Sequence, residues 1–242
     1  LTTVARSAQH CQEAESLLRE LAAQDLKLSQ AAKNSLSIKH IQNLSKARFN
    51  NLIRYFLQIN QCLMPSTEQV VQVYNQLGAA EGKTPAVKVG NNWLRRFKGE
   101  LYLTADFQDV STWIQEIDLP QIQLPDQLGT LVFNMGGADL KESKNSDPKN
   151  EVIAKHQVIA PKLGQKVTVK FCHHNPKCLP EYRQHSRSLK KVLQELSIAP
   201  WQRQRLPFLY YDEQLVAVIG HFICKPFIPA EAELAMQISW SK

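Results

Sequence analysis

The spacing of apolar residues predicts three helices in the first part of the chain. Apolar positions at three- and four-residue steps mark the inner face of a helix. This spacing covers the N-terminal stretch, residues 44–60 and the stretch after Pro65. Ser66 and Gln69 form a capping-box pair at the start of the third helix. The positions that define the first face are Cys11, Ala14, Leu18, Leu21 and Leu28. Those of the second face are Leu44, Arg48, Leu52 and Phe56, and this face is widened by Phe49, Ile53 and Leu57.

Beyond the third helix, the pattern changes from a helical period to an extended one. Residues 86–104 predict two or three short strands, with turns at 90–92 and 98–99. A linker is expected at 106–111, where the apolar pattern is interrupted. We therefore expect a first domain, residues 1–106, that is a mostly α-helical bundle with a small strand element at its end.

The remaining residues, 107–242, predict an α+β domain. Apolar runs of strand length, separated by Pro and Gly, indicate strands. One amphipathic helix is expected at 186–196, and the polar run 138–150 is expected to be a solvated loop. The predicted strands lie at 112–119, 129–135, 151–160, 166–171, 208–211, 214–222 and 235–240.

The composition is that of a folded soluble protein with room for two domains. The chain has 242 residues, of which 43% are apolar and 21% are charged. No uninterrupted apolar run reaches the about 18 residues that indicate a membrane span, so we expect none. An odd number of cysteines, five, favours free thiols in a reducing cytoplasm over a secreted disulfide framework. Because the chain starts with Leu1 inside a predicted helix, we interpret it as a piece of a longer protein.

The charge favours a polyanionic partner. The net charge is +7 and the pI is about 9.1. The segment 161–205 holds ten basic residues against Glu181 and Glu195, which leaves a net charge of +8. Trp201 lies among the basic residues that follow the helix, and the first amides of that helix would also face an anion. The candidates for phosphate contact are Arg187, Lys190, Lys191, Arg203 and Arg205.

Two features weaken the argument from charge. A solvated helix face would carry a similar run of lysines and arginines without binding anything. A second basic group consists of Arg95, Arg96 and Lys98. Alternation along a strand sends the two arginines to opposite faces, so at most one of them shares a face with Lys98.

Two cysteines and two histidines lie within the seven residues CHHNPKC, 172–178. A structural zinc site needs four converging ligands, which usually come as two close pairs. No second close pair exists elsewhere in the sequence, and Pro176 stiffens the loop. We therefore expect no metal and interpret this stretch as a polar loop that follows a strand.

The sequence offers no catalytic constellation. The stretch MGGADL, residues 135–140, is superficially similar to the SGGxDS pyrophosphate loop of ATP-dependent adenylating enzymes. Met135 and Leu140 stand where that loop has serines, and a charged, Pro-containing run follows instead of a helix, so a turn is the better interpretation. No serine elbow, Cys–His pair or carboxylate pair indicates catalysis. We expect neither a catalytic residue nor a bound cofactor in this chain.

The stretch SRSLKKVLQELSIAPWQRQRLPFLYYDEQLVAVIG, residues 186–220, closely resembles the C-terminal domain of the tRNA(Ile)-lysidine synthetase family, TilS. The first half resembles that family's substrate-binding domain at ARSAQHCQEAESLL, SKARFNNLIRYFL and LRRFKGELYL. The loop CHHNPKCLPEYRQH departs from the family, in which many members have a Gly- and Arg-rich loop. The matching family motifs are the Leu-Lys-Lys helix at Leu189-Lys190-Lys191, Pro-Trp-x-Arg at Pro200-Trp201-Gln202-Arg203, Leu-Pro-Leu at Leu206-Pro207-Phe208, and the valine-alanine strand at Leu215-Val216-Ala217-Val218.

The resemblance implies a function in tRNA modification. The family's enzyme uses ATP, with Mg²⁺, to adenylate the wobble cytidine of a tRNA(Ile), and lysine then displaces AMP. That chemistry resides in an N-terminal domain that we expect this chain to lack. The resemblance therefore implies the tRNA-binding C-terminal part of a cytoplasmic ligase. It would hold the acceptor stem of a tRNA(Ile) with a CAU anticodon through the five basic residues named above.

The resemblance also implies that the second domain has the fold of an editing-type domain of the phenylalanyl-tRNA synthetase β chain. Two other functions remain open. One is a basic protein-interaction module that meets an acidic partner, and its binding would show no preference for tRNA over other polyanions. The other is a zinc-stabilised RNA-binding module, which elemental analysis would test. A homodimer formed through the N-terminal helix also remains open.

Overall fold

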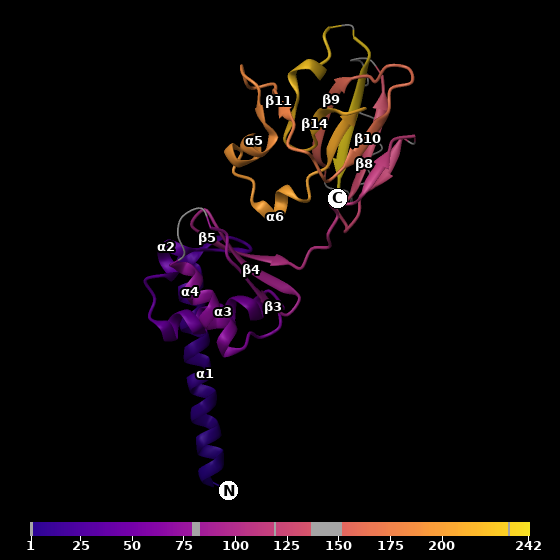
Figure 1. Ribbon diagram of the computed structural model, residues 1–242. Coiled ribbons are helices and arrows are strands. Elements are labelled where there is room, and N and C mark those ends of the chain that lie inside the picture. Colours follow the sequence, from indigo (N-terminus) through magenta and orange to yellow (C-terminus); the bar gives the residue numbers. More distant parts are fainter. Residues whose placement is uncertain (1, 79–82, 119, 137–151, 232) are drawn as a thin grey trace. The chain divides into compact units, whose positions relative to one another are not determined.

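The computed structural model describes residues 2–78, 83–118, 120–136, 152–231 and 233–242. The chain divides into two compact units, residues 1–107 (unit 1) and 108–242 (unit 2) (Figure 1). The described residues contain six α-helices and four antiparallel sheets. Most of the MGGADL stretch and the predicted polar loop at 138–150 fall outside the described residues.

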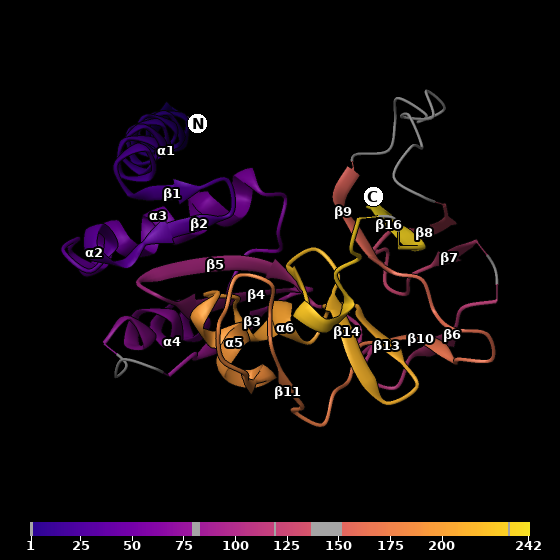
Figure 2. The ribbon, with the colours of Figure 1, turned by 90° about the horizontal axis from the view of Figure 1, so that it is seen from above.

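The described residues of unit 1 form four helices and a five-stranded antiparallel sheet in the order β1-β2-β5-β4-β3 (Figure 2). Side chains from the helices and the sheet form one core, in which Phe49, Phe56, Leu94 and Leu101 are fully buried. The elements are α1 (Thr2–Ser29), β1 (Gln30–Ala32), β2 (Ser35–Ser37), α2 (Ile38–Ile41), α3 (Lys46–Ile59), α4 (Thr67–Leu77), β3 (Ala86–Val89), β4 (Asn92–Phe97) and β5 (Glu100–Ala105).

The helical bundle predicted for the first domain is wrong, because a five-stranded antiparallel sheet shares one core with the helices of unit 1. The strands β1 and β2 have three residues each, which is too short for an alternating pattern to stand out in the sequence. The strand β2 joins the sheet by pairing with the distant β5, with Leu36 opposite Leu101, and β1 pairs with β2. The chain is therefore α+β in both units, and the predicted fold class is corrected accordingly.

Local signals in unit 1 were predicted correctly. The capping box of Ser66 and Gln69 is present at the start of α4, and residues 86–105 form three strands, β3 to β5. A tertiary contact then joins α1 to α3, because the carboxylate of the buried Asp25 accepts hydrogen bonds from Nε and Nη2 of Arg48. A buried carboxylate requires such a partner.

The described residues of unit 2 form three antiparallel sheets and two short α-helices. The sheets have the orders β15-β14-β13-β10-β6, β7-β8-β16-β9 and β11-β12. The elements are β6 (Ile114–Glu116), β7 (Gln121–Gln123), β8 (Thr130–Met135), β9 (Val152–Ile159), β10 (Val167–Lys170), β11 (Lys177–Cys178), β12 (Arg187–Ser188), α5 (Leu189–Glu195), α6 (Pro200–Arg203), β13 (Phe208–Tyr211), β14 (Gln214–Val218), β15 (Phe222–Ile223), the 3-10 helix η1 (Lys225–Phe227) and β16 (Ala235–Ser241).

The strand β13 explains how unit 2 is layered. Successive side chains of a strand point to opposite faces. Leu209 and Tyr211 belong to the core shared with the four-stranded sheet, whereas Phe208 and Tyr210 belong to the core beneath α5. All four side chains are buried. The five-stranded sheet therefore lies between the four-stranded sheet and the layer that contains α5.

No helix within the described parts of the chain is both long and apolar enough to cross a membrane.

Candidate nucleic-acid interface

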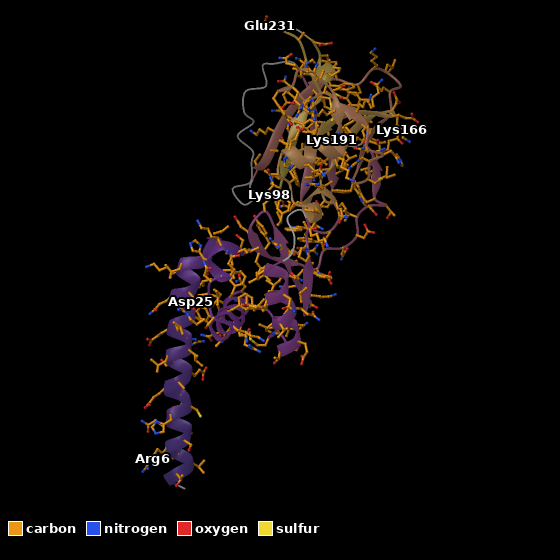
Figure 3. All side chains as sticks on the ribbon, turned by 60° about the vertical axis from the view of Figure 1, so that its left-hand side comes forward. Arg6, Asp25, Lys98, Lys166, Lys191 and Glu231 are labelled. Carbon is orange, nitrogen blue, oxygen red and sulfur yellow. The ribbon has the colours of Figure 1, made fainter. Side chains whose placement is uncertain are left out.

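The helix α5 presents one apolar face and one basic face. Leu189, Val192 and Leu193 are buried in the core that also holds Phe208 of β13. Lys190 and Lys191 lie on the solvent side of the same helix, where both are exposed, and Figure 3 labels Lys191 on unit 2. Among the described residues, no ion pair involves either lysine. Both ammonium groups are therefore available to a phosphate.

The loop that contains CHHNPKC caps the start of α5. The backbone N–H of Leu189 donates to the carbonyl oxygen of Pro176 at 2.9 Å, and that of Lys190 donates to Oδ1 of Asn175 at 2.8 Å. Asn175 has a φ of 51°, a left-handed conformation that asparagine tolerates better than most residues. These two amides are already satisfied, contrary to our expectation that the first amides of this helix face an anion.

Packing and burial fix the same loop in place. Nδ1 of His173 accepts a hydrogen bond from the backbone N–H of Asn175 at 3.0 Å, and its ring packs edge-on against Phe208, with centroids 5.1 Å apart. Burial lowers the pKa of His173, and the neighbouring His174 lowers it further. Burial raises the pKa of the Cys178 thiol to about 11, so this cysteine stays protonated at neutral pH. A protonated thiol is a poor metal ligand and a poor nucleophile.

Within the described ranges, no three His, Cys, Asp or Glu side chains gather as a metal site would require. In the loop, β11 pairs with β12, and Cys178 lies opposite Arg187. The loop therefore has a definite structural role, which is to position α5.

Replacing Asn175 by Ala should test that role. The variant loses the side-chain acceptor of the Lys190 amide and places alanine at a positive φ. We expect α5 to lose about 1 kcal/mol of stability, as for other lost helix caps. Hydrogen exchange at the amides of Leu189 and Lys190 would measure this loss. Asn175→Asp, which keeps the acceptor, is the matched control, and equal protection in all three proteins would contradict the capping role.

Glu195, at the last turn of α5, binds two arginines. Its Oε2 pairs with Nη1 of Arg183, and its Oε1 lies 3.6 Å from Nη1 of Arg187. The side chain of Arg187 remains 49% exposed, against 22% for Arg183. Pairs of this exposure contribute little to stability, so Arg187 can exchange its partner for a phosphate. From the sequence we treated Glu195 only as a negative charge that opposes the basic residues. Nothing in its spacing indicated that it pairs with Arg183 and Arg187.

The structure holds Arg203 and Arg205 differently from the two lysines. Nε of Arg203 donates to the carbonyl oxygen of Ile198 at 2.7 Å, and burial lowers the pKa of its guanidinium. Arg205 pairs with Asp126, and its side chain is only 13% exposed. Of the five candidates, the structure brings Arg187, Lys190 and Lys191 together on consecutive elements, and it engages the other two in contacts within unit 2.

The arginines of β4 leave opposite faces of the sheet, as the alternation predicted. Nη1 of Arg96 donates to the carbonyl oxygen of Gln76 in α4 at 3.2 Å. Nε of Arg95 donates to Oγ1 of Thr104, its neighbour in β5, at 2.9 Å. Arg96 therefore lies on the face that α4 covers, and it does not share a binding face with Arg95.

Comparison with known proteins finds a matching family model for each half of the chain. The family model described as the TilS substrate binding domain matches residues 36–102, and the model described as the TilS substrate C-terminal domain matches residues 167–240. The tRNA(Ile)-lysidine synthase of Serratia proteamaculans is 33% identical over an alignment of 243 residues. This alignment covers 98% of this chain and 51% of that protein. The corresponding protein of Coxiella burnetii is 32% identical over 231 residues, or 93% of this chain and 46% of that protein.

This chain spans about half the length of the relatives it matches. A crystal structure of a TilS C-terminal domain also aligns with 54% of this chain and 95% of that chain, with a TM-score of 0.39 and 13% identity, and this likeness is too low to support a conclusion by itself. The two family models and the sequence relatives agree with each other. The chain therefore belongs to the TilS family, of which it carries the substrate-binding domain and the C-terminal domain.

Proposed function

We propose that this chain is the tRNA-binding part of a tRNA(Ile)-lysidine synthase, and that the solvent face of α5 contacts the phosphate backbone of the tRNA. The observation that carries the proposal is the pair Lys190 and Lys191. Both lysines are exposed on a helix whose opposite face is buried, and neither forms an ion pair with any residue that the structure describes. Arg187 extends this basic surface from the adjacent strand β12.

Double-stranded RNA fits this surface. Proteins recognise an A-form stem mainly through its shape, its phosphates and its 2′-hydroxyl groups. Two adjacent ammonium groups on a short helix can contact phosphates without reading any base, which suits the acceptor stem. Arg203 and Arg205 would first have to give up their contacts with Ile198 and Asp126, so we assign the leading role to Lys190 and Lys191.

The same proposal places this chain in a larger reaction. The complete enzyme would ligate lysine to the wobble cytidine of a tRNA(Ile) with a CAU anticodon, in the cytoplasm and at the expense of ATP with Mg²⁺. The residues of α5 and its capping loop would hold the tRNA body and would not contact ATP.

A salt titration of tRNA binding tests the proposal. The chain is titrated with tRNA(Ile) that has a CAU anticodon, and with a tRNA that differs in its acceptor stem, at several salt concentrations. We expect affinity to fall steeply as salt rises, because each phosphate contact releases counterions. A preference for the cognate stem would show that the chain also discriminates between tRNAs. A steep slope without preference would restrict the role to a backbone clamp. Absence of binding would refute the proposal and favour an acidic protein partner.

A further inference from the structure

Tyr182 is an exposed aromatic side chain beside the basic surface of unit 2. It lies in the segment between β11 and β12, and 53% of its surface is exposed. Exposed tyrosines are common. Tyr182 differs from a mobile surface tyrosine because its ring and its backbone are both held in place.

The ring of Tyr182 rests against the core. Its centroid lies 6.3 Å from that of the fully buried Phe222, and the two rings are perpendicular. This geometry is one that aromatic pairs prefer. Burial raises the pKa of the Tyr182 phenol, while Arg183 lowers it and Glu181 and Glu195 raise it. The ring is therefore uncharged at neutral pH.

The backbone around Tyr182 is held by hydrogen bonds to β15 and the residue that follows it. The N–H of Glu181 donates to the carbonyl oxygen of Ile223 at 3.0 Å, and the N–H of Ile223 donates to Oε2 of Glu181 at 2.7 Å. Pro180 forms a bridge with Cys224. A rigid aromatic loses little conformational entropy when it binds a ligand.

An ion pair joins Arg183, the residue next to Tyr182, to the helix α5. The neighbouring Arg183 pairs with Glu195, which also pairs with Arg187. Lys191 precedes Glu195 by four residues on α5, so the two side chains share a face of the helix. The segment that carries Tyr182 is therefore held against the helix that carries the lysine pair.

We propose that Tyr182 stacks on an unpaired or terminal base of the bound tRNA. This proposal rests on the proposed function and adds a second kind of contact to it. Bases inside a stem are already stacked on their neighbours and offer no face to a side chain, so only a single-stranded or terminal base can meet this ring. Stacking on aromatic side chains is the usual way in which proteins hold such bases. If the lysines of α5 contact the acceptor stem, the nearest unpaired nucleotides are those of its single-stranded 3′ end.

The test compares two RNAs and four proteins. The RNAs are tRNA(Ile) and the same tRNA without its unpaired 3′ nucleotides. The proteins are the unsubstituted chain, Tyr182→Ala, Tyr182→Phe and the double variant Lys190→Ala with Lys191→Ala. Circular dichroism confirms that each variant is folded. We expect Tyr182→Ala to weaken binding of the intact tRNA about tenfold, as for other stacked bases, and to leave binding of the shortened tRNA unchanged. Tyr182→Phe keeps the ring and should bind like the unsubstituted chain.

The outcomes separate the two proposals. If the lysine variant binds both RNAs more weakly while Tyr182→Ala binds both normally, the stacking proposal is refuted and the proposed function stands. If Tyr182→Ala lowered the affinity for both RNAs equally, stacking would also be refuted, because the effect would not depend on the unpaired nucleotides. If the unsubstituted chain binds neither RNA, both proposals fail.

Discussion

Replacing Lys190 and Lys191 together by alanine should weaken tRNA binding by about 1 to 3 kcal/mol and flatten its salt dependence. The two side chains are exposed on the outer face of α5, opposite the face that is buried in the core, so their removal should change binding without unfolding the unit. Each lysine that contacts a phosphate contributes about one to the slope of log affinity against log salt, so the slope should fall by about two.

The matched control removes two other exposed lysines of unit 2, Lys162 and Lys166. They precede β10, whereas the loop that caps α5 follows that strand. Lys166 pairs with Glu116 of β6, at 2.8 Å. Lys162→Ala with Lys166→Ala should keep most of the salt slope. If the α5 variant keeps its affinity and slope, or if the control loses as much, α5 is not the tRNA-binding element.

Replacing Phe208 by Ala should cost unit 2 about 3 to 5 kcal/mol of stability, which is the usual range for a fully buried phenylalanine. Phe208 is 0% exposed. It lies in the same core as the buried face of α5, and its ring packs against that of His173. The cavity would therefore loosen both the helix and its capping loop. Hydrogen exchange of amides in β13 and β14 measures this loss for unit 2 separately, since two units need not unfold together.

Phe208→Leu is the control for this substitution, because it fills most of the volume and should cost less than about 1.5 kcal/mol. Weaker tRNA binding by Phe208→Ala at a temperature where it remains folded would link the core beneath α5 to function. If Phe208→Ala were no less stable than Phe208→Leu, the packing described beneath α5 would be wrong.

Several features could be predicted from sequence because their causes lie within a few residues. The capping box of α4 depends on Ser66 and Gln69, which are three positions apart. The inner face of α5 follows from the spacing of Leu189, Val192 and Leu193, and all three are buried. The family resemblance was also readable, because it rests on short contiguous motifs.

Features that depend on distant partners could not be predicted. The strands β1 and β2 are too short to recognise, and β2 is stabilised by pairing with β5, more than sixty residues later in the chain. This pairing turns the expected helical bundle into an α+β unit. Likewise, Asn175 caps α5 from a loop fifteen residues before Lys190, where the sequence suggested only a polar connection or a metal site.

The sequence by itself determined the helical periods, the turns, the excess of positive charge in 161–205 and the family. Only the tertiary structure decided which of those basic side chains pair with an acidic residue and which stay exposed to solvent. Arg205 meets Asp126, which lies 79 residues away in the sequence, and Arg187 and Arg183 share Glu195, whereas Lys190 and Lys191 stay exposed. The net charge of a segment is the sum of its residues, so it can be read from the sequence without the fold. Neutralisation of a charge requires an opposite charge within a few ångströms, and the fold alone sets that distance.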